Sequence, residues 1–188
     1  MSKIHVLRRV LIGAASAATI SAGLAWATTG SGTQSTLLGR VTFDGFEVTR
    51  RVVVASPRAV KDQAVAQDRD RSRRGRTVWE VEVEAEPELD VATQMIIFQP
   101  GGQSGWHSHP GPVFISVIEG TMTFYESDDP RCEPIVRHAG EGFLDGADEH
   151  AHIARNESGA NATNLVTYFA PPGAPLRIDA PDPGHCPF

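Results

Sequence analysis

Short apolar runs separated by Gly and Pro are the feature that most restricts how this chain can fold. Residues 79–84 (WEVEVE) alternate strictly between apolar and acidic side chains. That period is typical of a strand with one buried and one wet face. Further strand-like runs cover residues 46–55, 91–98, 113–118, 121–125, 134–138, 150–154 and 163–170. Many short strands with turn residues between them predict an all-β sandwich or barrel.

A charged segment between residues 57 and 75 interrupts this pattern. It lacks strand alternation, and its end interleaves Asp with Arg in the run DRDRSRRGR over residues 68–76. A run of mixed charge is typical of a solvated loop rather than of a nucleic-acid patch.

The first residues have the layout of a secretory signal peptide. Three basic residues precede an uncharged run over 10–27, which closes on the cleavage pattern Ala25-Trp26-Ala27. We therefore predict that residues 1–27 are removed and that the protein is exported to the periplasm or the extracellular space. An uncleaved anchor helix is one alternative. Twin-arginine export, from the pair Arg8-Arg9, is another.

Signal cleavage makes an acidic chain more acidic. It removes three basic and no acidic residues, so the formal net charge falls from −6 to −9. Such a charge disfavours nucleic acid or an anionic membrane as a partner. A flexible lead-in rich in Thr, Ser and Gly is expected over residues 28–36, followed by a single domain over 37–188.

The two cysteines, Cys132 and Cys186, are expected to form a disulfide. An even number of cysteines in an exported chain favours a bridge. The bridge would tie the C-terminal tail to the body of the domain. Two soft metal ligands are the competing interpretation, although neither cysteine has a partner at metal-ligand spacing.

Histidine pairs carry the strongest signal for chemistry. His107 and His109 form one pair, and His150 and His152 form another. Residues i and i+2 of a strand point to the same side, so each pair can present two imidazoles to one space. Imidazole suits Fe, Mn, Ni, Cu and Zn, and a barrel can bring two such pairs to one interior.

The residues around these pairs resemble the two cupin motifs. Residues 101–109 (GGQSGWHSH) match the opening of the first motif, a Gly, five residues and then His-x-His, and Gly120 falls where that motif closes. The spacing from His152 to Asn156 matches the end of the second motif, although its usual Pro-x-Gly reads Gly-Ala-Asp at 146–148. The resemblance covers residues 91–170 and implies a small single-domain cupin, an all-β jelly-roll barrel or double-stranded β-helix.

The resemblance also implies one divalent transition metal on His107, His109 and His152. The glutamate that completes the family's ligand set does not carry over, because Val113 occupies its position. Three neutral imidazoles would leave the full charge of Fe, Mn, Ni, Cu or Zn at the centre, with open positions for substrate or oxygen. A metal-free barrel is the structural alternative.

Several residues could replace the missing glutamate as a fourth ligand. His150 would share the face of His152, and Asp145 or Asp148 could reach in from the preceding loop. Glu149 should face away in a regular strand, and Glu119 is expected at a turn. An apolar pocket beside the centre is expected from Trp106, Val113 and Phe114.

A metal-dependent enzyme acting on a small organic molecule is the function that these features favour. Dioxygen chemistry is the natural reaction class for a three-histidine centre. No general base stands out, and Glu149, Asp148 and Tyr125 are only candidates. A non-catalytic module that binds a small molecule is the main alternative, and a structural or storage cupin is a third. The sequence leaves the oligomeric state of the chain open, and a homodimer is one alternative.

Overall fold

The chain folds into two facing β-sheets joined along one side. The computed structural model describes residues 27–55, 76–146 and 150–188. Its strands are β1 (Ser31–Ala55), β2 (Arg76–Gln103), β3 (His107–Ser108), β4 (Val113–Glu119), β5 (Thr121–Glu126), β6 (Ile135–His138), β7 (Gly142–Asp145), β8 (His152–Arg155), β9 (Ala162–Ala170) and β10 (Ile178–Asp179). The first sheet has the order β1-β2-β9-β4-β7 and the second β10-β3-β8-β5-β6. A single pairing of β2 with β8, Gln103 with Arg155, connects the two sheets.

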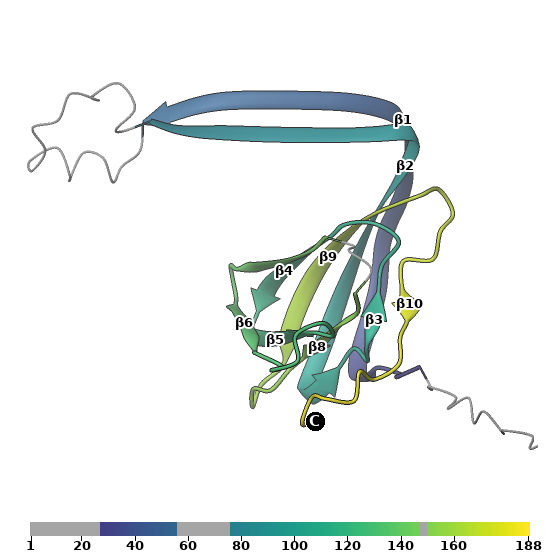
Figure 1. Ribbon diagram of the computed structural model, residues 1–188, viewed down its shortest axis with the longest axis vertical. Helices are drawn as coiled ribbons and strands as arrows, with labels where there is room; N and C mark the ends of the chain where they lie inside the picture. The colour runs from purple at the N-terminus through teal and green to yellow at the C-terminus, as the bar shows by residue number, and fades with distance from the viewer. Residues whose placement is uncertain (1–26, 56–75, 147–149) are drawn as a thin grey trace, which may run out of the picture.

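This arrangement is the expected all-β jelly roll (Figure 1). Every described pairing between strands is antiparallel. Alternation along β4, whose burial runs buried-exposed-buried-exposed-buried from Val113, puts every second side chain between the sheets. None of the described residues belongs to a helix that is long and apolar enough to cross a membrane.

The core fills the space between the two sheets. Its fully enclosed members include Phe98, Val113, Met122 and Phe124. The Phe124 ring stacks on the ring of Phe143, with centroids 4.4 Å apart. Because β5 and β7 belong to different sheets, this stack closes the barrel across its interior.

Two motif glycines are required by close approaches of the backbone. Gly105 and Gly120 have φ angles of 72° and 74°, a region that side chains with a Cβ rarely adopt. A Cβ at Gly105 would lie 2.5 Å from the carbonyl oxygen of Thr28, and one at Gly120 would lie 2.6 Å from that of Asn161. These contacts explain why this chain has a glycine two residues before His107 and another at the β4–β5 turn.

The long strands β1 and β2 form a two-stranded ribbon that projects beyond the barrel (Figure 1). Register shifts at Asp44/Phe46 mark where it leaves the sheet. Val48, Val81 and Val83 on this ribbon are exposed. The expected strand over 79–84 is therefore present, but the prediction that one of its faces is buried is wrong. Alternation shows which side chains share a face, whereas burial of that face requires a second layer of the protein. No described residue covers this ribbon.

The start of the domain also differs from the sequence-based expectation. Residues 31–36, expected within a flexible lead-in, belong to β1 and pair with β2. Thr and Ser are compatible with an edge strand once a neighbouring strand accepts their backbone hydrogen bonds. Of the expected signal peptide, only Ala27 is described, and it forms a bridge with Pro181. The expected loop over 57–75 lies outside the described residues.

Candidate metal centre

Three histidines of the second sheet converge between the two sheets. His107 in β3 pairs directly with His152 at the start of β8, and His109 follows two residues after His107. Their ring centroids lie 4.4–5.2 Å apart. One ligand nitrogen from each lies within 4.8 Å of the others, and all three side chains are buried. The two histidine pairs of the sequence thus contribute three imidazoles to one point, not four.

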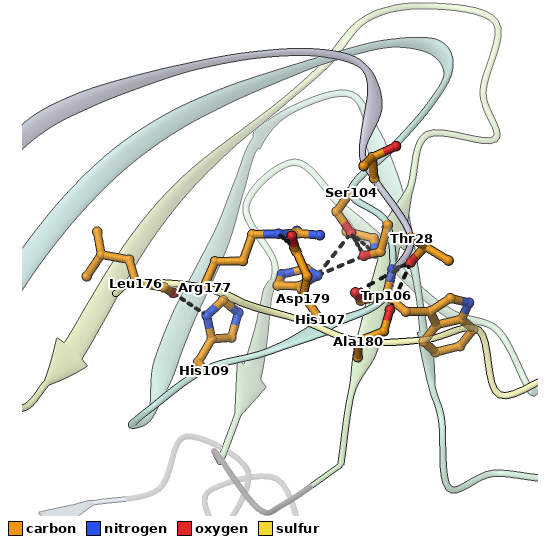
Figure 2. Close-up of polar contacts among 12 residues, drawn as sticks. Thr28, Ser104, Trp106, His107, His109, Leu176, Arg177, Asp179 and Ala180 are labelled. Atoms are coloured by element: carbon orange, nitrogen blue, oxygen red, sulfur yellow. Dashed lines mark hydrogen bonds and ion pairs between the residues drawn. The ribbon is translucent and has the colours of Figure 1, made fainter. Parts of the chain in front are cut away.

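Two of the three imidazoles have a hydrogen-bond acceptor at the Nδ1 atom. His107 Nδ1 lies 2.8 Å from the carbonyl oxygen of Gly105, and His109 Nδ1 lies 2.6 Å from that of Leu176 (Figure 2). His152 Nδ1 lies at an ion-pair distance of 3.0 Å from Asp145 Oδ2 and makes no hydrogen bond in the described part of the chain. An acceptor at Nδ1 favours the tautomer that carries its proton there. The Nε2 lone pairs of His107 and His109 then remain for a metal ion, and the two carbonyl oxygens fix the orientation of these rings.

Burial keeps the imidazoles of His107 and His109 neutral. It lowers the pKa of His107 far below its ordinary value, and the charges of His152, Arg177 and His109 lower that pKa further. Burial and the charge of His152 lower the pKa of His109 to about 4, against the opposing effects of the Leu176 carbonyl and Asp145. Neutral imidazole is the form that binds metals.

Asp145 and Tyr168 approach the cluster from the first sheet. Asp145, at the end of β7, is almost fully enclosed, and its Oδ2 also lies 3.9 Å from His109 Nε2. The Tyr168 ring of β9 lies 5.4 Å from that of His109, and its hydroxyl donates to Gln94 Oε1 at 2.8 Å. Burial raises the pKa of Tyr168 to about 12, against the opposing effect of Arg177, so the phenol is protonated at neutral pH.

Asp145 was one of several fourth-ligand candidates in the sequence, and its contact with His152 points to a positioning role. Tyr168 was not anticipated at all. A period-2 count along residues 162–170 would have placed it on the inner face, because residues 162, 164, 166, 168 and 170 are all buried.

His150 does not join the cluster. Its Nε2 lies 3.9 Å from Glu126 Oε1, and its side chain is partly exposed. His150 precedes β8, so the alternation that would align it with His152 does not extend to it. The candidates Asp148 and Glu149 lie outside the described residues.

Two of the three expected pocket residues lie elsewhere. Phe114 is half exposed and packs on Phe169 on the outer face of the first sheet. Trp106 is buried in a second cluster and stacks on Phe188, and Figure 2 shows its ring pointing away from His107 and His109. Both follow from the strand period, since each is one residue away from an inward-facing neighbour.

Val113 faces the interior between the two sheets. It is fully buried and pairs in register with Asp145 on one side and Tyr168 on the other. An apolar side chain therefore stands in the position of the family glutamate, between two residues that reach the cluster.

Other singled-out residues are structural. The Tyr125 hydroxyl donates to Glu157 and its ring belongs to the cluster of Trp106. Glu119 is exposed and accepts a hydrogen bond from Thr163. Asn156 is buried and donates to the carbonyl oxygens of Phe98 and Ala160.

The disulfide expected between Cys132 and Cys186 is present in the structure. It fastens the C-terminal tail against the Trp106 cluster, where the Arg155 guanidinium lies 4.0 Å from the centre of the Phe188 ring. With both sulfurs in this bridge, the alternative of two cysteine metal ligands does not apply to this state of the protein.

Sequence comparison agrees with the geometry of the site. Residues 94–168 match the model of the family described as Cupin domain. This chain contains a cupin domain. The matched segment of the domain runs from β2 to β9 and includes all three clustered histidines.

Solved structures of other proteins are similar to parts of this one. An oxalate oxidase is 27% identical with a TM-score of 0.36, over 42% of this chain and 41% of that chain. A polyketide cyclase from Streptomyces resistomycificus is 20% identical with a TM-score of 0.41, over 50% and 64% of the two chains. An RmlC-like cupin from Methanocaldococcus jannaschii is 20% identical with a TM-score of 0.37, over 50% and 72%.

The matched part of this chain thus spans less than half of the oxalate oxidase chain. With TM-scores of this size, the activities of the solved proteins are not assigned to this chain. No curated protein matches the chain in sequence.

Proposed function

We propose that this chain is an exported, metal-dependent cupin enzyme that acts on a small organic molecule, with dioxygen chemistry as its reaction class. The observation that carries the proposal is the convergence of the buried His107, His109 and His152, whose ligand atoms lie within 4.8 Å of one another. Three imidazoles that converge in this way are a donor set typical of a transition-metal site.

The donor set fits one divalent first-row transition metal, and His107, His109 and His152 would hold it. Three neutral nitrogen ligands suit Fe, Mn, Ni, Cu or Zn, whereas Mg and Ca prefer oxygen. An ion on three ligands, when bound, supplies a positive centre with open positions for substrate or oxygen.

The surrounding residues of the chain prepare this centre. The carbonyl oxygens of Gly105 and Leu176 and the Asp145 carboxylate hold the rings in fixed orientations. Val113 contributes an apolar wall that limits water near the histidines. The protonated hydroxyl of Tyr168 is held by Gln94, so it stabilises the ring position rather than accepting a proton.

Export is part of the proposal because of the disulfide. Bridges of this kind persist in oxidising compartments such as the periplasm or the extracellular space. The Cys132–Cys186 bridge and the signal-peptide pattern therefore support the same location.

Metal content of the purified mature chain tests the metal site. Elemental analysis after supplementation with Fe, Mn, Ni, Cu and Zn should give about one ion per chain. His107→Gln should lose that ion while a thermal melt shows that the barrel still folds. His138→Gln is the matched control, because the His138 side chain is exposed on β6, where it contacts Thr121. An equal metal content in wild type and His107→Gln would overturn the site.

One alternative is a binding module that holds a small molecule without catalysis. The contact between Asp145 and His152 favours it, because that carboxylate is already engaged and does not stand ready as a base. Oxygen uptake by the metal-loaded protein over a panel of organic acids, alcohols and phenols separates the two functions. Binding without oxygen consumption or product would support the module.

A further inference from the structure

A cationic side chain from the C-terminal segment shares the interior face with the histidines. In β10, Ile178 pairs with Ser108 and Asp179 pairs with His107, so Arg177 lies opposite His109. Because alternate residues of paired strands share a face, Arg177 and Asp179 project to the side of the histidine pair. In Figure 2 the Arg177 side chain extends towards Asp179 and His107.

One nitrogen of the Arg177 guanidinium donates a hydrogen bond, whereas another has no acceptor in the described part of the chain. Its Nε donates to Asp179 Oδ1, and two-thirds of the side chain is buried. Its Nη2 atom is enclosed and has no hydrogen-bond partner in the described part of the chain. A buried donor on a charged group without an acceptor is costly, so such a group is typical of a place where a ligand is bound.

The charge of Arg177 acts on the candidate metal centre. It lowers the pKa of His107, of His109 and of Tyr168, in each case as a smaller effect than burial. A divalent ion on three neutral imidazoles would add two positive charges to that of the guanidinium, against the negative charges of Asp145 and Asp179, which leaves one net positive charge. This excess of positive charge in a partly enclosed space attracts an anion.

We propose that Arg177 binds the carboxylate of an organic acid whose neighbouring oxygen reaches the three-histidine centre. The inference rests on the proposed function and names the substrate class for that site. A planar carboxylate can accept two parallel hydrogen bonds from one guanidinium edge. Asp179 occupies Nε and so directs the Nη end towards the ligand. One guanidinium charge matches one carboxylate, whereas a phosphate dianion calls for more donors.

Cobalt-loaded mature protein provides the test, because the visible absorption of cobalt changes when an anion binds nearby. Lactate is the probe, lactamide is its neutral isostere, and inorganic phosphate is the competing anion. Wild type should bind lactate more tightly than lactamide or phosphate. Arg177→Gln should weaken lactate binding by about 10-fold or more, as expected for losing a charge-assisted hydrogen bond. Arg177→Lys should recover only part of this loss.

The controls separate recognition from structure. Arg177→Gln should leave lactamide binding unchanged and should not weaken cobalt binding, because it removes a positive charge near the centre. Arg51→Gln, an exposed arginine on the ribbon, should behave like wild type. Equal lactate affinity in wild type and Arg177→Gln, an equal loss for lactamide, or an Arg177-dependent preference for phosphate would each overturn the inference.

If the proposed metal-dependent function is wrong, the experiment gives a result that differs from failure of the carboxylate site. If no metal binds, the same ligands are compared by thermal melts of the metal-free protein. An Arg177-dependent shift with lactate would then support the carboxylate site while the metal-enzyme proposal fails. The absence of that shift would overturn the carboxylate site as well.

Discussion

The side chain of Asp145 links the first sheet to two of the three histidines. Its carboxylate contacts His152 Nδ1 and lies within 4 Å of His109, with both partners enclosed. A carboxylate in this place orients its imidazole and raises the basicity of the metal-facing nitrogen.

We therefore expect Asp145→Asn to bind metal about 10- to 100-fold more weakly, the range for such supporting partners. Competition with a chelator of known affinity measures the change. The control is Glu119→Gln, which replaces an exposed carboxylate on β4 and should keep the wild-type affinity for the metal. Unchanged metal binding in Asp145→Asn would show that the carboxylate does not support the site.

The carboxylate of Asp90 should make the stability of the barrel sensitive to acid. The hydrogen bond from Thr42, a bond from the backbone of Gly173 and contacts with Arg40 lower its pKa from 3.8 to about 2. A lowered carboxyl pKa stabilises the folded state above the unfolded value, and this stabilisation is lost as the pH falls from about 4 to about 2.

Urea midpoints at pH 6, 4 and 2.5 measure this effect. Wild type should lose stability over that window, and Asp90→Asn should be less stable at pH 6 but lose less on acidification. Glu88→Gln, on the same strand and exposed, should keep the wild-type difference. Parallel acid profiles for wild type and Asp90→Asn would contradict this assignment.

At the scale of elements, the projecting ribbon of β1 and β2 is separable from the barrel. None of the residues of the main core cluster lies between 46 and 85. The ribbon pairs only with itself in the described part of the chain, so its stability should come from its own hydrogen bonds and side-chain pairs.

Replacing residues 46–85 with a short Gly-Ser linker should therefore leave the metal content and cooperative unfolding of the barrel intact. Phe124→Ala provides the contrast, since removing a buried core ring should destabilise the protein by about 3–5 kcal/mol. A thermal melt of each variant makes the comparison. Loss of cooperative unfolding in the linker variant would show that the ribbon is part of the folding unit.

For the whole molecule, the disulfide joins the tail to the barrel across 54 residues. In the chain-entropy model, closing a loop of this length stabilises the folded state by about 4 kcal/mol. The closed loop contains β10 and the two residues before it, Arg177 and Leu176, and the Leu176 carbonyl oxygen accepts from His109.

The double variant Cys132→Ala, Cys186→Ala should accordingly show a lower urea midpoint and weaker metal binding. Reducing agent should shift the midpoint of the wild type in the same direction and leave that of the variant unchanged. If reduction leaves the wild-type midpoint where it was, the bridge does not contribute to stability.

The sequence alone indicated the strand pattern, and its resemblance to the cupin motifs implied the set of His107, His109 and His152. The strand pattern depends on local rules, since the period of two and the turn glycines act within a few neighbouring residues. The same rules misplaced Phe114 and Trp106, where the inward or outward direction depends on how each strand enters the sheet.

Only the tertiary structure decided which residues of the other segments reach the histidines. Asp145, Tyr168 and Arg177 arrive from β7, β9 and the segment before β10. Their approach depends on the pairing of strands far apart in the chain, such as β10 with β3. That register is set by packing over the whole core rather than by any pattern near these residues.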